Sequence, residues 1–160
     1  MFILIIIFVS NMEKHISNIH KLGVRPLPAN FGPLRNANAN ARIKGPCGDI
    51  MEIWLRIDEQ HIQQATYVTD GCHSSHACGA MTAWIAESKS LKEALNLTPE
   101  EILKAAGEMV EEHCALLAVN TLRAALDNYQ KQQKIIVNHD LSLEFSHKSH
   151  LISKILKLKI

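Results

Sequence analysis

Residues 69–81 read TDGCHSSHACGAM, and here the sequence changes from a strand pattern to a helix pattern. The segment holds Cys72 and Cys78, two of the four cysteines in the chain, together with two histidines. The other two cysteines, Cys47 and Cys114, lie far from it in the sequence. Thiolates and imidazoles bind metals, and thiolates are also nucleophiles. The sequence therefore raises the question of whether these cysteines converge on one site.

Two runs before this segment have the alternation of β-strands. Residues 50–57 alternate with a period of two, and residues 62–69 do so again after a turn at 58–61. The face of the first run expected on the core consists of Met51, Ile53, Leu55 and Ile57. The two runs predict a β-hairpin. The proline-containing arm at 23–46 adds at most one edge strand.

After the hairpin the period becomes that of helices. A helix is predicted from His76 to near Ser88. Its core stripe is expected to consist of Ala77, Met81, Trp84 and Ile85. Ser90 and Thr98 each open a capping box and predict two short helices, and residues 113–131 predict a long amphipathic helix. The fold class expected is α+β, with a small antiparallel sheet packed against helices and a long C-terminal helix.

Composition and charge exclude several classes of partner and of protein. A formal net charge of +1 gives no overall field for nucleic acid or an anionic membrane, so neither is an expected partner. Four cysteines in 160 residues are too few for a small disulfide scaffold, and no secretory context accompanies them. Metal or thiol chemistry in a reducing compartment, with a cytoplasmic location, is the expectation.

The two ends of the chain are treated apart from the core. Residues 1–9, MFILIIIFV, are about half of the ~20 residues that a spanning helix needs, so they are not interpreted as a membrane anchor. Residues 1–22 are interpreted as an N-terminal extension, with Met12 favoured as the natural start. Residues 23–134 form the expected domain. Residues 135–160 are expected to be a flexible tail or a surface helix, without an assigned function.

The hairpin and the last helix are expected to gather five candidate ligands. A short turn brings the outer ends of paired strands together, which places Cys47 and Asp49 beside Cys72. His113 and Cys114 open the last helix, where free N–H groups and the helix dipole favour a thiolate. Three thiolates, an imidazole and a carboxylate suit zinc or an iron-sulfur cluster.

Three further residues of the 69–81 segment are weaker candidates for metal ligands. Cys78 falls on the helix with apolar neighbours, which favours core packing over a ligand role. His76 could be an additional ligand only if the helix begins early, and His73 is expected to cap or to be solvated. From the residues alone, a zinc site of structural or hydrolytic role and a thiol redox enzyme using Cys72 and Cys78 stay open. A catalytic zinc site needs a general base close to an open coordination position, and no residue beyond Asp49 is an obvious candidate.

Five motifs give the chain a family resemblance. They are GPCGD at 45–49, MEIWLRID at 51–58, TDGC at 69–72, SLKEAL at 90–95 and HCALLAVNTLRAAL at 113–126. In this order and spacing, residues 45–129 resemble the iron-sulfur cluster assembly scaffolds of the NifU/IscU type. The resemblance implies a scaffold without catalytic residues. A cysteine desulfurase would supply sulfur, a transient [2Fe-2S] cluster would form with iron, and the cluster would pass to apo iron-sulfur proteins.

The resemblance also implies roles for particular residues. Cys47, Cys72 and Cys114 would be the cluster thiolates, with Cys114 the candidate persulfide acceptor. Asp49 and His113 would complete the assembly site, and Asp49 would keep the cluster labile, because a hard oxygen weakens retention beside soft iron-thiolate bonds. Zinc can occupy such sites as well. A homodimer is kept as a further expectation.

The chain departs from the family pattern in two places. Cys78, His73 and His76 stand where the family has small or apolar residues, so the choice of ligands could differ. The Leu-Pro-Pro-Val-Lys segment that some members offer to a dedicated Hsp70-type chaperone is absent, and EMVEE at 108–112 takes its place. Release by such a chaperone is therefore not expected.

Overall fold

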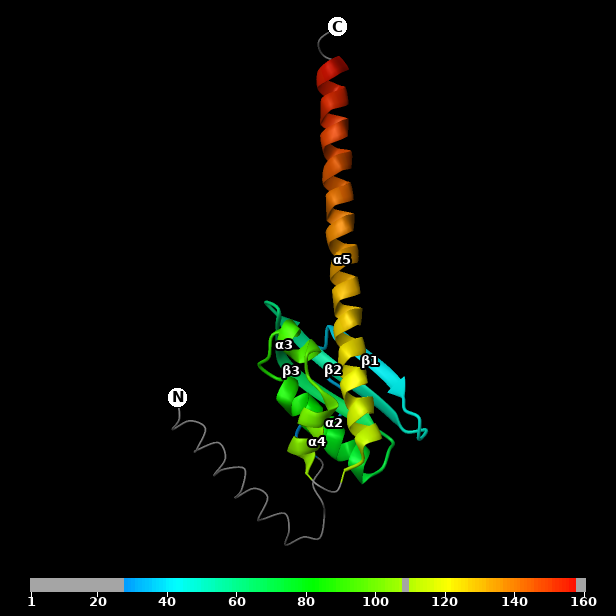
Figure 1. Cartoon of the computed structure of the whole chain (residues 1–160). Helices are drawn as coiled ribbons and strands as arrows, with labels where there is room; N and C mark the ends of the chain where they lie inside the picture. Colours follow the sequence, from blue (N-terminus) through cyan, green and yellow to red (C-terminus); the bar gives the residue numbers. More distant parts are fainter. Residues whose placement is uncertain (1–27, 108–109, 158–160) are drawn as a thin grey trace, which may run out of the picture.

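The structure is a computed structural model that describes residues 28–107 and 110–157, with side chains as far as 137. The N-terminal extension with Met12, the first two residues of EMVEE and residues 158–160 lie outside the described residues. In the described part, three strands form an antiparallel sheet in the order β1-β2-β3 (Figure 1). Their bounds are Ala39–Lys44 for β1, Ile50–Asp58 for β2 and His61–Thr69 for β3. The predicted hairpin and edge strand are confirmed.

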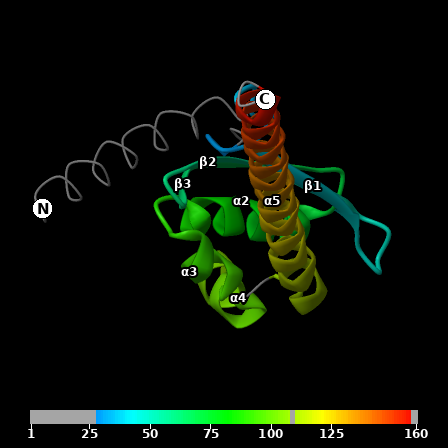
Figure 2. The ribbon, with the colours of Figure 1, turned by 90° about the horizontal axis from the view of Figure 1, so that it is seen from above.

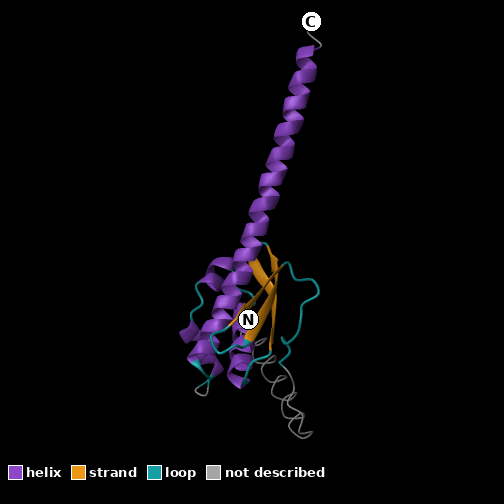
Figure 3. Ribbon diagram, turned by 90° about the vertical axis from the view of Figure 1, so that its right-hand side faces the viewer, coloured by secondary structure: helices purple, strands orange, loops and turns teal. Residues whose placement is uncertain are grey.

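The helices cover one face of this sheet (Figure 3). They are α2 (His73–Ala86), α3 (Leu91–Leu95), α4 (Pro99–Ala106) and α5 (Glu112–Lys157). Seen along α5, α2 lies directly against the sheet, with α3 and α4 on the far side of α2 (Figure 2). The α+β architecture expected from the sequence is therefore present.

The strand alternation was predicted correctly, and so were the two caps. On β2, the four residues expected on the core face are all buried, at 4% exposure or less. A positive φ at Glu59 and Gln60 makes the tight turn into β3. Ser90 and Thr98 both form complete capping boxes, with Glu93 and Glu101 as the reciprocal partners. Local hydrogen bonds thus set the starts of α3 and α4.

Helix α2 differs from its prediction in both start and orientation. It begins at His73, three residues before His76, with Cys72 as its N-cap residue. Its buried face is made of small residues, which are Ser74, Ser75, Cys78, Gly79, Ala80, Thr82, Ala83 and Ala86. Trp84 is 58% exposed, so the predicted core stripe is wrong at this position. Met81 and Ile85 are partly buried at the edge of the core.

Helix α5 packs on the sheet by its first half and continues well beyond the domain (Figure 1). The sequence predicted residues 113–131, whereas the helix runs from Glu112 to Lys157. Residues 132–157 contain no glycine or proline that would end a helix. The last buried side chain among those described is Tyr129, and Ile135, Ile136 and Val137 are each more than half exposed. None of the helices in the described residues is sufficiently long and apolar to cross a membrane.

Candidate metal site

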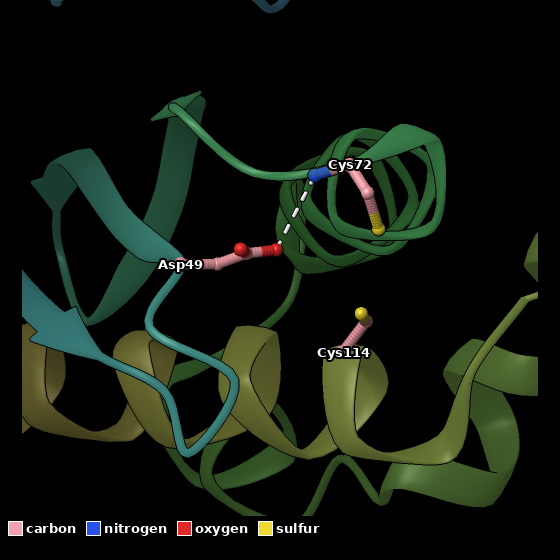
Figure 4. Close-up of side chains that lie close together, drawn as sticks. All are labelled: Asp49, Cys72 and Cys114. Carbon is pink, nitrogen blue, oxygen red and sulfur yellow. Dashed lines mark hydrogen bonds between the residues drawn. The ribbon is translucent and has the colours of Figure 1, made fainter.

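Three elements bring Asp49, Cys72 and Cys114 together (Figure 4). Asp49 directly precedes β2, Cys72 caps α2, and Cys114 lies in the first turn of α5. One ligand atom from each residue lies within 4.8 Å of the other two. The hairpin and the last helix therefore bring three of the five predicted ligands to one point. Two sulfurs and one carboxylate oxygen at this separation are suited to a single metal ion or a small cluster.

The carboxylate of Asp49 is held by two donors from α2. Its Oδ2 accepts hydrogen bonds from the Ser75 hydroxyl at 2.6 Å and from the backbone N–H of Cys72 at 3.3 Å. These bonds, the Ser75 bond first, lower the pKa of Asp49 below its ordinary value. Gly71 makes the approach possible, because a Cβ there would overlap the carboxylate and lie 2.7 Å from the Cβ of Ser75. Asp49 is thus charged and fixed.

The two cysteines of the group differ in their environment. Cys72 is exposed, and its pKa is lowered, mainly by the backbone N–H groups of Ser75 and Ser74 at the start of α2. Cys114 is fully buried, and burial raises its pKa, although the nearby Ser75 hydroxyl partly opposes the effect. This direction is opposite to the one expected for a cysteine at the start of the last helix, and burial is its largest cause. The activating helix terminus is that of α2.

Two predicted ligands lie beside the group of three. Cys47 is exposed in the loop between β1 and β2 and is not among the residues whose ligand atoms lie within 4.8 Å. Its thiol is still close enough to lower the pKa of Asp49 through a hydrogen bond. His113, half-buried next to Cys114, lowers the same pKa by its charge. The structure places both residues at the margin of the site, and their ligand roles stay predictions.

Cys78 and His76 are not part of the group of three. Cys78 is fully buried in the core, and burial raises its pKa to about 12, which disfavours the thiolate that redox chemistry or metal binding needs. His76 follows Cys72 by one helical turn, yet its ring packs against Phe31 at a centroid distance of 5.4 Å. Its Nδ1 lies 3.5 Å from the hydroxyl of Tyr67. All four cysteines lie in the described part of the chain and are free thiols.

Sequence reasoning missed Ser75. Its side chain is fully buried, and its hydroxyl lies 3.3 Å from Cys114 Sγ and 4.0 Å from Cys72 Sγ, besides the bond to Asp49. The signal in the sequence that could have identified Ser75 was its spacing of three residues from Cys72. If Cys72 caps a helix, the residue three positions later returns to the same side. A helix start placed at His76 removed this signal.

Comparison with known proteins assigns the family. The model of the NifU-like N-terminal domain matches residues 25–135, which span all three strands, α2 to α4 and the first half of α5. The chain belongs to this family. The resemblance inferred from the five motifs is thereby confirmed.

Relatives of known name agree with the family assignment. The iron-sulfur cluster assembly scaffold protein IscU 1 of Archaeoglobus fulgidus is 31% identical over 121 residues, covering 73% of this chain and 79% of the relative. The protein named iron-sulfur cluster assembly scaffold protein IscU in Aquifex aeolicus is 31% identical over 111 residues, covering 66% and 71%. The crystal structure of a NifU-like protein (N-terminal) from Brucella abortus superposes with a TM-score of 0.51. It is 14% identical and covers 64% of this chain and 86% of that one, so it supports the fold alone.

Proposed function

We propose that the protein is a scaffold on which iron and desulfurase-derived sulfur are assembled into a transient [2Fe-2S] cluster for transfer to apo-proteins. The observation that carries the proposal is the grouping of Asp49, Cys72 and Cys114, with ligand atoms within 4.8 Å of one another, in a chain of the NifU-like family. The family supplies the class of reaction. The donor atoms supply the chemistry, because thiolates are the usual ligands of iron-sulfur clusters.

The arrangement of the donors suits a cluster that arrives and leaves. Cys72 and Cys47 are exposed, so iron and sulfur can reach their thiols directly. Cys114 provides a buried, fixed ligand from the core side. Cys47, on the loop next to Asp49, is proposed as the third thiolate, with His113 as an adjoining group. The hard oxygen of Asp49 would hold iron less firmly than a fourth thiolate, which favours release.

Cys72 and Cys114 differ in how readily each thiol could accept sulfur from a desulfurase. We retain Cys114 as the proposed acceptor of persulfide sulfur. Cys72 is the competing acceptor, since its thiol is exposed and its pKa is lowered. Mass spectrometry of the chain after incubation with a cysteine desulfurase and cysteine, without iron, would locate the added sulfur on a peptide that contains one cysteine or the other.

The proposed partners are a cysteine desulfurase and apo iron-sulfur proteins in a reducing, cytoplasmic setting, with a homodimer as a further proposal. Zinc is the alternative occupant, because two thiolates and a carboxylate also suit that ion. The core position of Cys78 speaks against a Cys72–Cys78 redox pair, since its thiol is fully buried.

Reconstitution tests the proposal. The purified chain is incubated anaerobically with ferrous iron, cysteine and a cysteine desulfurase, and the visible charge-transfer bands of a cluster are followed. We expect bands on the wild type and their loss when Cys47, Cys72 or Cys114 is changed to Ser. Cys78→Ala is the matched control and should still form the cluster. Full cluster formation in all three Ser variants would rule out the proposed site, and a colourless chain that retains zinc would favour the zinc alternative.

A further inference from the structure

Ser75 lies at the centre of the metal site, although it has no ligand role in the proposed function. It is fully buried one helical turn after Cys72. Its hydroxyl oxygen is 2.6 Å from Asp49 Oδ2, 3.3 Å from Cys114 Sγ and 4.0 Å from Cys72 Sγ. One side chain therefore touches all three residues of the group.

The hydrogen-bond geometry assigns a direction to this contact. A hydroxyl carries one proton and an ionised carboxylate can only accept, so the proton of Ser75 goes to Asp49 at 2.6 Å in preference to the Cys114 sulfur at 3.3 Å, as a charge-assisted hydrogen bond. The backbone N–H of Cys72 donates to the same oxygen, Oδ2, at 3.3 Å. Both donors come from the start of α2 and hold the carboxylate by the same oxygen.

We propose that Ser75 is a positioning residue, whose hydroxyl holds Asp49 by Oδ2 so that the carboxylate faces the same point as Cys72 and Cys114. The proposal rests on the proposed function, since it concerns the same site. Mutation of a residue that hydrogen-bonds to a metal ligand and orients it commonly lowers metal affinity by about 10- to 100-fold. Without the hydroxyl, the carboxylate loses its shortest hydrogen bond and is free to turn away from the two sulfurs.

A structural role for the buried hydroxyl is the competing explanation, and α2 itself provides the comparison. Thr82 lies two turns after Ser75 on the same face and is also fully buried. The Thr82 hydroxyl has no hydrogen-bond partner among the described residues. A buried hydroxyl on this face is therefore not tied to a carboxylate as a matter of course, and the contacts of Ser75 are particular to the site.

Cobalt binding tests the proposal without any cluster chemistry. Co²⁺ is titrated into the metal-free, reduced chain, and the dissociation constant and the d–d spectrum are compared among the wild type, Ser75→Ala, Asp49→Ala and the double variant. Alanine is the best helix former, so Ser75→Ala should fold, and circular dichroism and urea unfolding check this. Thr82→Ala is the matched control for loss of a buried hydroxyl from α2.

We expect Ser75→Ala to bind Co²⁺ about tenfold more weakly and with a changed d–d band, while Thr82→Ala binds like the wild type. Adding Ser75→Ala to Asp49→Ala should cause no further loss, because the hydroxyl acts through the carboxylate. Wild-type affinity and spectrum in Ser75→Ala, or an equal loss in both backgrounds, would overturn the proposal. If the wild type binds no Co²⁺ at all, the site behind the proposed function fails together with the role of Ser75. If cobalt behaves as expected but no cluster assembles, only the scaffold function fails.

Discussion

Gly79 on α2 packs directly against the ring of Tyr67 on β3. A Cβ built on Gly79 would come within 2.5 Å of Tyr67 Cδ2 and 2.9 Å of Cε2. Tyr67 is itself fully buried, and residues 30–32 pair with its backbone on the outer edge of β3. The ring therefore has little room to withdraw. This contact sets how closely α2 approaches the sheet, and with it where the N-terminus of α2 presents Cys72.

Gly79→Ala should destabilise the fold. The added methyl group overlaps a buried aromatic ring, and overpacking of this kind costs about 1–3 kcal/mol. The better helix propensity of alanine would offset up to about 1 kcal/mol of this cost. We expect a net loss in the free energy of unfolding, measured by urea denaturation. Replacing Tyr67 by Leu supplies the control, because the penalty of Gly79→Ala should shrink when the ring is absent. An equal penalty in both backgrounds would show that the ring contact is not its cause.

The contact between Gly79 and Tyr67 explains why the buried face of α2 was not predicted from the sequence, although other parts of the fold were. The alternation of β2 and the capping boxes at Ser90 and Thr98 depend on local pattern, and they were predicted correctly. The buried face of α2 was not predicted correctly. Its buried residues are small and partly polar, because a close approach to the sheet selects for size. Hydrophobic periodicity instead favoured Trp84, which is exposed.

Gly71→Ala should weaken metal binding. The Cβ would overlap the Asp49 carboxylate and crowd Ser75, so Asp49 would have to leave its two donors on α2. We expect a loss of Co²⁺ affinity of about tenfold or more, the range seen when groups that orient ligands are disturbed. Gly45→Ala is a suitable control, because its Cβ would meet the side chain of Leu117 and the backbone oxygen of Asp49, and not the Asp49 carboxylate. Undiminished affinity in Gly71→Ala would mean that the carboxylate position is not needed.

Cysteine alkylation should distinguish the thiols by pH. The thiolate is the reactive form, and the pKa of Cys72 is lowered whereas that of Cys114 is raised by burial. At pH 7 the metal-free chain should therefore be alkylated by iodoacetamide at Cys72 well before Cys114. The rate at Cys72 should rise to its plateau at a lower pH than that of an unperturbed thiol. Cys78, with a pKa of about 12 and no exposure, should stay unmodified.

Peptide mass spectrometry over a pH series measures these rates. Alkylation after unfolding in urea is the control, because all four cysteines should then react at similar rates. Faster modification of Cys114 than of Cys72 in the folded chain would contradict the assigned environments.

The candidate site was predictable to the extent that topology determines it. Strand pairing and the start of the last helix suffice to bring Asp49, Cys72 and Cys114 together. The position of Cys47 depends on the loop between β1 and β2, whose conformation is not written in a periodic pattern. Ser75 depends on the exact first residue of α2, and helix ends are the least certain part of a sequence-based prediction. Both differences thus arise where a few backbone angles decide which side chain faces the site.

Ending the chain after Lys134 should leave the domain intact. The last buried side chain described on α5 is Tyr129, and Ile135 to Val137 are exposed, so removing residues 135–160 takes away no described core contact. The free energy of unfolding should change by less than about 0.5 kcal/mol, as for surface changes, and Co²⁺ affinity should stay the same. Ending the chain before Leu126 is the contrasting variant. It removes two buried side chains, Leu126 and Tyr129, and should cost several kcal/mol, on the order of the loss for large core truncations. A marked loss of stability in the chain that ends after Lys134 would instead show that α5 beyond residue 134 contributes to the folded domain.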